Sequence, residues 1–113
     1  MSDAQVGLHL DVGKSQVDGM DPAFVLAIGD ILTYGAAKYE KYNWARGIKY
    51  TRIYASAMRH LLRWYGGEDI DPESGLPHLS HAATNLMFLV SYTSHEKYET
   101  FDDRPFKGEA EKA

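Results

Sequence analysis

Side chains that bind cations or transfer protons are concentrated in one stretch of this sequence, residues 59–85. Three of the five histidines lie there, at His60, His78 and His81. The segment between them carries four carboxylates among glycines and prolines, at Glu68, Asp69, Asp71 and Glu73. Carboxylates hold hard divalent cations, and imidazoles exchange protons near neutral pH. The stretch therefore predicts a site for a metal ion or a polyphosphate.

The spacing of these residues places them on two helix faces. His60 is followed at intervals of four by a tryptophan and a glutamate, and His78 is followed by His81 and Asn85 at intervals of three and four. Residues at such intervals lie on one side of a helix. If helices over 51–66 and 78–98 pack antiparallel across the loop, His60 faces the region of His81. We therefore expect the two sets to line one groove.

The acids and the histidines suit different ligands. A hard cation such as Mg²⁺ prefers oxygen ligands, which favours Glu68, Asp71 and Glu73 as its holders. The histidines suit Mn²⁺ or a transition metal, a hydrogen bond to phosphate, or a role as acid or base. The alternative is that the acidic loop only caps the following helix and stays solvated.

A basic segment precedes this loop. Between residues 38 and 63 a single acid, Glu40, accompanies the cations Lys38, Lys41, Arg46, Lys49, Arg52, Arg59 and Arg63. Basic residues beside an acidic loop fit a small polyphosphate ligand that is held partly through a cation. Arg59 and Arg63 either bind phosphates by bidentate hydrogen bonds or pair with Asp69 and Asp71 to close the loop. Lys38 either reaches a phosphate or remains a surface lysine.

Aromatic and amide side chains near the basic segment are candidates for contacting a nucleobase. The chain has eight tyrosines and two tryptophans, which is generous for 113 residues. Stacking and edge recognition would involve Tyr39, Asn43, Trp44 and Asn85. The alternative for the aromatic residues is packing in the core or at a subunit interface.

Length and composition exclude several classes of protein. A chain of 113 residues forms one domain, and its formal charge of −4 argues against binding a nucleic acid polymer. Cysteine is absent, so no disulfide or thiolate chemistry is available. The sequence shows no apolar run that would span a bilayer and no signal-peptide core. We therefore expect no membrane partner and a cytoplasmic location.

Periodicity predicts an all-α fold, a small bundle of three or four helices. We expect a flexible arm over 1–19, a helical nucleotide-binding domain over 20–99 and a tail over 100–113. Asp21 and Pro22 predict the start of a helix over 22–34. A short helix over 36–42 and the helices over 51–66 and 78–98 follow. Because the apolar arcs are wide, we expect a homodimer or homotetramer to cover the remaining apolar surface.

Several segments together resemble a known family. They are the run Tyr34-Gly35-Ala36-Ala37-Lys38-Tyr39, the pair Asn43-Trp44 with Gly47, the run Arg59-His60-Leu61-Leu62 with Trp64, and residues 67–79 with the pair His81-Ala82. Over about residues 14 to 92 the chain is similar to the phage-type dATP/dGTP diphosphohydrolase N-terminal domain, usually grouped with the MazG-like, all-α nucleotide pyrophosphohydrolases. The block from residue 67 to residue 81 is the most specific part of the resemblance.

The resemblance implies an oligomeric helical bundle with a Mg²⁺ or Mn²⁺ site that hydrolyses a purine deoxynucleoside triphosphate to the monophosphate and pyrophosphate. It implies that Glu68, Asp71, Glu73 and His78 are metal ligands and that His60, His81 and Glu68 are catalytic. It also implies phosphate contacts from Lys38, Arg59 and Arg63. The wider superfamily carries a Glu-x-x-Glu motif on its helices, which is missing from the two central helices here; Glu96 and Glu99 have this spacing but lie near the chain's end.

Three hypotheses follow. The first is a metal-dependent nucleotide pyrophosphohydrolase. The second is a non-catalytic phage protein that sequesters a nucleotide, such as a signalling molecule, and it is motivated by the missing helical carboxylates. The third is a structural or regulatory oligomer whose histidines are ordinary buried polar groups.

Overall fold

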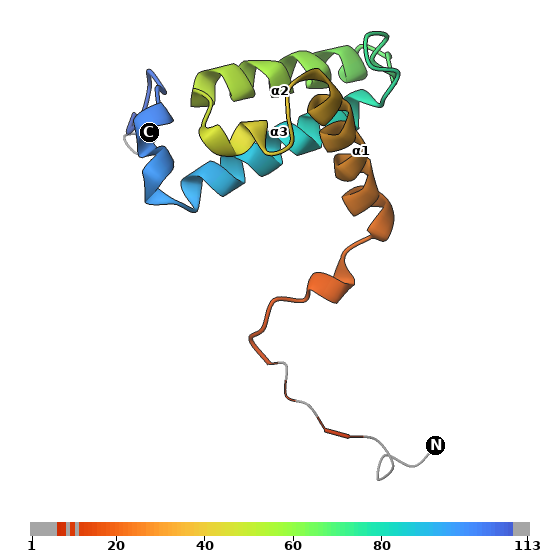
Figure 1. Ribbon diagram of the computed structural model, residues 1–113, viewed down its shortest axis with the longest axis vertical. Helices are drawn as coiled ribbons and strands as arrows, with labels where there is room; N and C mark the ends of the chain where they lie inside the picture. Colours follow the sequence, from red (N-terminus) through yellow and green to blue (C-terminus); the bar gives the residue numbers. More distant parts are fainter. Residues whose placement is uncertain (1–6, 9, 11, 110–113) are drawn as a thin grey trace.

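In the computed structural model, which describes residues 7, 8, 10 and 12–109, the chain is all-helical (Figure 1). Three α-helices are present, α1 (Pro22–Lys38), α2 (Tyr50–Tyr65) and α3 (His78–Thr93). Among the described residues, three short 3₁₀ helices accompany them, η2 (Val17–Gly19), η3 (Asn43–Arg46) and η4 (Glu96–Phe101). The predicted all-α class is confirmed. No helix among the described residues is long and apolar enough to cross a membrane.

Helix α1 begins as predicted but ends later. The Asp21 side chain accepts a hydrogen bond from the Ala23 amide at 3.0 Å, and Pro22 occupies the first helical position. The helix then continues through Gly35 to Lys38, so the predicted end at residue 34 and the separate helix over 36–42 were wrong. One interior glycine costs only about 1 kcal/mol, and the two alanines after it are the strongest helix formers. The extra turn carries Lys38 to the loop between α2 and α3, where it pairs with Glu73 at 3.5 Å.

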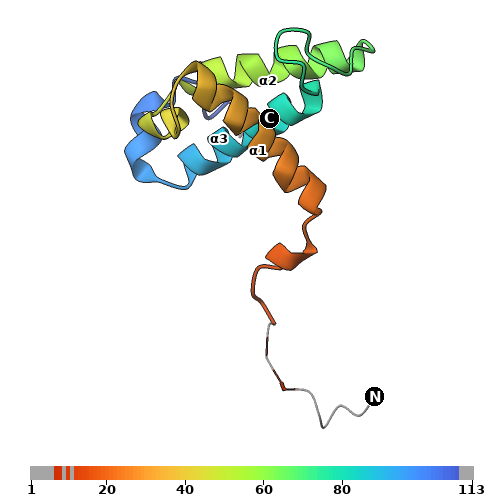
Figure 2. The same ribbon diagram turned by 45° about the vertical axis from the view of Figure 1, so that its right-hand side comes forward.

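Helices α2 and α3 form an antiparallel hairpin, and α1 crosses α3 (Figures 1 and 2). The apolar side of α2 is buried through Ile53 and Ala57, and α3 contributes Ala82 to the same interior. The predicted antiparallel arrangement is therefore confirmed. It brings His60, in the carboxyl-terminal half of α2, opposite the first turn of α3.

The far end of the hairpin is closed by a hydrophobic cluster made mostly of aromatic residues. Its buried members are Tyr50, Ile53, Tyr92 and Tyr98. The hydroxyl of Tyr92 donates to the Trp44 carbonyl at 2.6 Å, and that of Tyr98 donates to the Ala45 carbonyl at 2.7 Å. Burial raises the pKa of Tyr92 to about 12, so its hydroxyl remains a donor. Two core tyrosines therefore hold η3 in place.

Helix α3 stops at Thr93, earlier than the predicted end at residue 98. The Thr93 and Ser94 hydroxyls both donate to the Val90 carbonyl, at 2.9 and 2.8 Å. Side-chain hydrogen bonds of this kind compete with the helical pattern. His95 then adopts extended backbone, with φ −136° and ψ 124°, before η4 begins.

Residues 100–109, expected to be part of a tail, contact the helices. Asp103 accepts hydrogen bonds from the backbone amide and the hydroxyl of Thr51, at 2.9 and 2.6 Å, in the first turn of α2. Phe101 packs against Gly47, whose φ of +99° suits glycine and where any Cβ would overlap the Phe101 ring. Residues 1–6, 9 and 11 of the predicted arm, and 110–113 of the predicted tail, lie outside the described residues.

Candidate functional site

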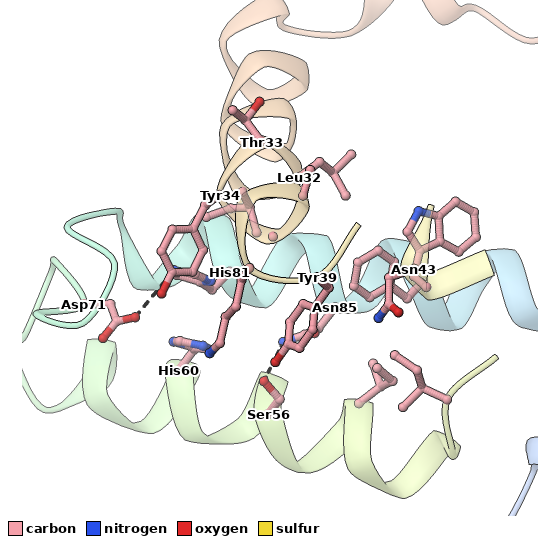
Figure 3. A pocket seen from close by; sticks show the side chains of 18 of the residues that line it. Leu32, Thr33, Tyr34, Tyr39, Asn43, Ser56, His60, Asp71, His81 and Asn85 are labelled. Carbon is pink, nitrogen blue, oxygen red and sulfur yellow. Dashed lines mark hydrogen bonds and ion pairs between the residues drawn. The ribbon is translucent and has the colours of Figure 1, made fainter. Parts of the chain in front are cut away.

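A cleft of about 990 Å³ opens between the carboxyl-terminal half of α1, the segment after it, and the α2–α3 hairpin. Every residue predicted from the sequence as a site residue lines it except Glu68. Figure 3 shows side chains from several elements directed into this space, with His60 from α2 beside His81 from α3. The fold therefore brings the predicted residues together, as their spacing indicated. Their roles are a separate question.

The first chain of hydrogen bonds in the cleft runs from Glu68 to His60. Glu68 Oε1 lies 2.7 Å from Nε2 of His78, and Nδ1 of His78 lies 2.9 Å from Nδ1 of His60. His78 is 1% exposed, so both nitrogens of a buried ring are satisfied. While these bonds hold, His78 has no nitrogen left for a metal ion.

The second chain runs from Asp71 to His81 through a serine. The Ser74 hydroxyl lies 3.1 Å from Asp71 Oδ2 and 2.7 Å from Nε2 of His81. Burial alone would raise the pKa of Asp71, but hydrogen bonds from the Glu73 amide and the Ser74 hydroxyl, with His81 and His60 nearby, lower it below its usual value. The sequence analysis missed Ser74, because a serine in a turn gives no functional signal.

The two chains end on a stacked pair of imidazoles. The ring centroids of His60 and His81 are 4.4 Å apart with an interplanar angle of 4°, and the Tyr34 ring meets His81 edge-on at 6.1 Å. Burial, followed by the charge of His81, lowers the pKa of His60. Burial is also the largest cause that lowers the pKa of His81. Both rings therefore favour the neutral form, which suits a base or a hydrogen-bond acceptor.

Basic side chains surround this pair. Lys38, Arg59 and Arg63 all line the cleft and are exposed. Lys38 forms an ion pair with Glu73 at 3.5 Å, and Arg63 lies 3.7 Å from Glu68. Within the described part of the chain, neither arginine pairs with Asp69 or Asp71; backbone hydrogen bonds close the loop instead, including that from the His78 amide to the Asp69 carbonyl at 2.9 Å. Exposed ion pairs of this kind contribute little to stability.

The opposite end of the cleft is rich in aromatic residues. Trp44 stacks on Phe88 with ring centroids 5.5 Å apart. Asn85 donates from its amide nitrogen to the Ser56 hydroxyl at 3.0 Å, as Figure 3 shows. Asn43 lines the same end, and Tyr39 is largely exposed beside it. Ser56, one turn before His60, was not identified from the sequence, where it reads as an ordinary helix residue.

The carboxylates predicted to hold a metal ion are engaged with other groups. Glu68 contacts His78, Asp71 accepts from Ser74, and Glu73 pairs with Lys38. Across the described ranges, no group of three or more histidine, aspartate and glutamate side chains is arranged to hold a metal ion. The residues therefore do not form an all-protein cage for a cation.

Comparison with known proteins agrees with the resemblance noted in the sequence. The family model described as "dATP/dGTP diphosphohydrolase, N-terminal" matches residues 4–104. A protein of Salmonella phage PMBT28 named dATP/dGTP diphosphohydrolase is 36% identical over 98 residues, which cover 87% of this chain and 33% of that protein. The chain thus spans about a third of the length of this relative. No solved structure matches the chain significantly. The chain belongs to the dATP/dGTP diphosphohydrolase N-terminal family.

Proposed function

We propose that the cleft binds a purine (deoxy)nucleoside triphosphate and hydrolyses it to the monophosphate and pyrophosphate. The observation that carries this proposal is that the two ends of one cleft differ. One end has stacked neutral imidazoles among three basic side chains, and the other has aromatic rings with amides. A volume of about 990 Å³ is at the upper end for a small-molecule site. The name of the phage relative supports a purine deoxynucleotide.

The difference between the two ends would orient the nucleotide. The triphosphate would lie near Arg59, Arg63 and Lys38, because guanidinium and ammonium groups form charge-assisted hydrogen bonds with phosphate oxygens. The base would lie near Trp44, where an aromatic face is available for stacking, and within reach of the Asn85 amide. Asn43 and Tyr39 complete this end of the cleft.

Hydrolysis to these products requires water to attack the α-phosphorus. A new phosphorus–oxygen bond forms as the bond from that phosphorus to the bridging oxygen of the β-phosphate breaks, and pyrophosphate leaves. His60 accepts a proton from the water and is stabilised through His78 by the negative charge of Glu68. His81, stacked on His60, is the alternative base. The basic side chains stabilise the charge that develops on the leaving group.

The proposal includes a Mg²⁺ or Mn²⁺ ion that arrives with the nucleotide. Mg²⁺ is commonly held by one or two carboxylates together with substrate phosphates, which suits the donors present better than a cage of protein ligands does. Asp71 and Glu73, both on the cleft wall, would hold it. When bound, the ion would neutralise charge on the phosphates. Chelation by EDTA should then abolish turnover while leaving the fold intact.

The direct experiment is to incubate the purified chain with a panel of nucleoside triphosphates and either metal, and to identify the products. We expect monophosphate and pyrophosphate in equal amounts from a purine deoxynucleotide. The His60→Asn variant should lose turnover, whereas His95→Asn, which changes an exposed histidine outside the cleft, should retain it. Release of a diphosphate and inorganic phosphate would contradict the proposal.

A second candidate function is binding without turnover, as in a protein that sequesters a nucleotide. The engaged carboxylates favour it, since no three-donor metal group forms among the described side chains. Binding of a nucleotide that is insensitive to EDTA, followed by its recovery intact after denaturation, would select this function over hydrolysis.

We further propose that the chain acts as a homodimer or homotetramer in the cytoplasm, the host's if a phage encodes it. Supporting this, the amino-terminal half of α1 projects from the hairpin (Figure 1), and Phe24, Val25 and Leu26 on it are 49, 50 and 67% exposed. We call these three residues the α1 apolar surface. In a symmetric assembly, a second copy of this chain would cover the α1 apolar surface.

A further inference from the structure

The hydrogen-bonded chain that begins at Glu68 has a fixed direction. An ionised carboxylate carries no hydrogen, so Glu68 only accepts, and Nε2 of His78 must donate. In neutral His78 the other nitrogen, Nδ1, then has a lone pair and accepts from the Nδ1–H of His60. His60 is left with its hydrogen on Nδ1 and its lone pair on Nε2.

The chain that begins at Asp71 produces the opposite result. The carboxylate of Asp71 accepts the hydrogen of the Ser74 hydroxyl. A hydroxyl has a single hydrogen, so Ser74 must accept at its other contacts, from the Leu76 amide at 3.2 Å and from Nε2 of His81 at 2.7 Å. His81 therefore carries its hydrogen on Nε2 and its lone pair on Nδ1.

Both lone pairs are open to a ligand. Throughout the part of the chain that the structure describes, every buried side-chain nitrogen and oxygen has a hydrogen-bond partner. Nε2 of His60 and Nδ1 of His81 take part in neither chain, so both must be accessible to solvent. Both rings line the cleft.

We propose that two positioning pairs, Glu68 with His78 and Asp71 with Ser74, hold the stacked histidines in opposite tautomers. His60 then presents Nε2, and His81 presents Nδ1, as hydrogen-bond acceptors on the cleft wall. His78 and Ser74 are positioning residues, because each acts through the ring that it orients. The inference rests on the proposed function only for the identity of the donor, which is the attacking water.

The test is the tautomeric state of each ring, measured by NMR correlation of the ring nitrogens with the ring carbon-bound hydrogens in ¹⁵N-labelled protein. The pH is set so that the imidazoles are neutral. We expect the hydrogen on Nδ1 in His60 and on Nε2 in His81. The exposed His95, which has no hydrogen-bonded carboxylate behind it in the described structure, should show a mixture and provides the internal reference.

Two variants test the two chains of hydrogen bonds separately. Ser74→Ala should move His81 toward a mixture of both tautomers and leave the tautomer of His60 unchanged. Glu68→Gln should move His60 toward a mixture and leave the tautomer of His81 unchanged. Thermal unfolding establishes that each variant is folded. A hydrogen on Nε2 of His60 in the unmodified protein, or an unchanged His81 in the serine variant, would overturn the inference.

These measurements need no substrate, so they decide the inference even if no nucleotide is turned over. If turnover is observed, Glu68→Gln, which acts on the proposed base His60, should lower kcat by up to about 100-fold, the lower end of what a positioned base contributes, with KM nearly unchanged. Ser74→Thr keeps the hydroxyl and should restore the tautomer of His81 that Ser74→Ala releases. Failure of the proposed function would instead appear as no turnover in any variant together with the expected tautomers.

Discussion

The stacked pair of His60 and His81 makes the stability of the protein depend on pH. Burial lowers the pKa of both rings below the value of 6.5 for an unperturbed histidine. As the pH falls through that value, the unfolded chain therefore takes up protons before the folded chain does. The stabilisation is fully present above about pH 6.5 and decreases below it.

We expect the free energy of unfolding in urea to be lower at about pH 5.5 than at about pH 7.5. His81→Gln should reduce this difference, because the glutamine does not titrate. His95→Gln, at an exposed position, should leave the difference as it is. A pH dependence that is the same in all three proteins would contradict the assignment.

Arg59 is the residue at which phosphate binding is most directly tested. It lines the cleft, and among the described residues it forms no ion pair with a carboxylate. A charge-assisted hydrogen bond contributes about 1.5–3 kcal/mol, so Arg59→Ala should raise the Kd for a nucleoside triphosphate by roughly 10- to 100-fold. Arg46→Ala is the matched control, because Arg46 pairs with Glu40 and does not line the cleft. Calorimetric titration would measure both; equal effects would show that the loss is not specific to the cleft.

At the scale of elements, η3 forms the wall of the cleft that carries Trp44, and its position depends on two buried tyrosines. The hydroxyls of Tyr92 and Tyr98 donate to the carbonyls of Trp44 and Ala45. Sequence separations of 48 and 53 residues show that these bonds connect distant parts of the chain. The last turn of α3 and the helix η4 thus stabilise the end of the cleft that we assign to the base.

Tyr92→Phe should lower the free energy of unfolding by about 0.5–1.5 kcal/mol, because it removes the hydrogen bond from the Tyr92 hydroxyl to the Trp44 carbonyl, which keeps the Gly47 amide as its other donor. The same variant should weaken nucleotide binding by loosening Trp44. Tyr54→Phe, at an exposed position on α2, is the control and should change neither quantity. Urea unfolding and nucleotide titration measure the two effects. A stability loss with unchanged affinity would mean that η3 does not position Trp44 for binding.

At the scale of the whole molecule, the single chain exposes more surface than a compact monomer of its mass. The accessible area is 9095 Å² for 12.7 kDa, against roughly 6,200 Å² expected from the scaling for monomeric proteins. The exposed segment over residues 12–20 accounts for part of the excess. A standard interface buries about 800 Å² per partner, so the excess leaves room for an interface between copies.

We therefore expect the protein to form a dimer or tetramer at micromolar concentration, measured by light scattering after size-exclusion chromatography. The double variant Val25→Asp and Leu26→Asp should be monomeric, because charges on the α1 apolar surface would be buried without partners. Asp30→Lys, at another exposed position on α1, should keep the oligomer. A monomeric unmodified protein would overturn the expectation.

The sequence by itself determined the features that depend on near neighbours in the chain. Helical spacing placed His60 opposite His81, and Asp21 with Pro22 marked the start of α1, because capping and amphipathic faces act over one or two turns. The acidic loop and the basic segment were also visible as composition, which is why the predicted residues gather in one cleft.

Only the tertiary structure decided which groups bond to which. Ser74 became the partner of His81, Ser56 that of Asn85, and Asp103 that of Thr51, although each is an ordinary polar residue in the sequence. Such hydrogen bonds depend on atoms being placed within about 3 Å, which requires the packing of the whole chain and leaves no periodic signature. For the same reason, the carboxylates that composition suggested for a metal ion are distributed among separate partners in the folded protein.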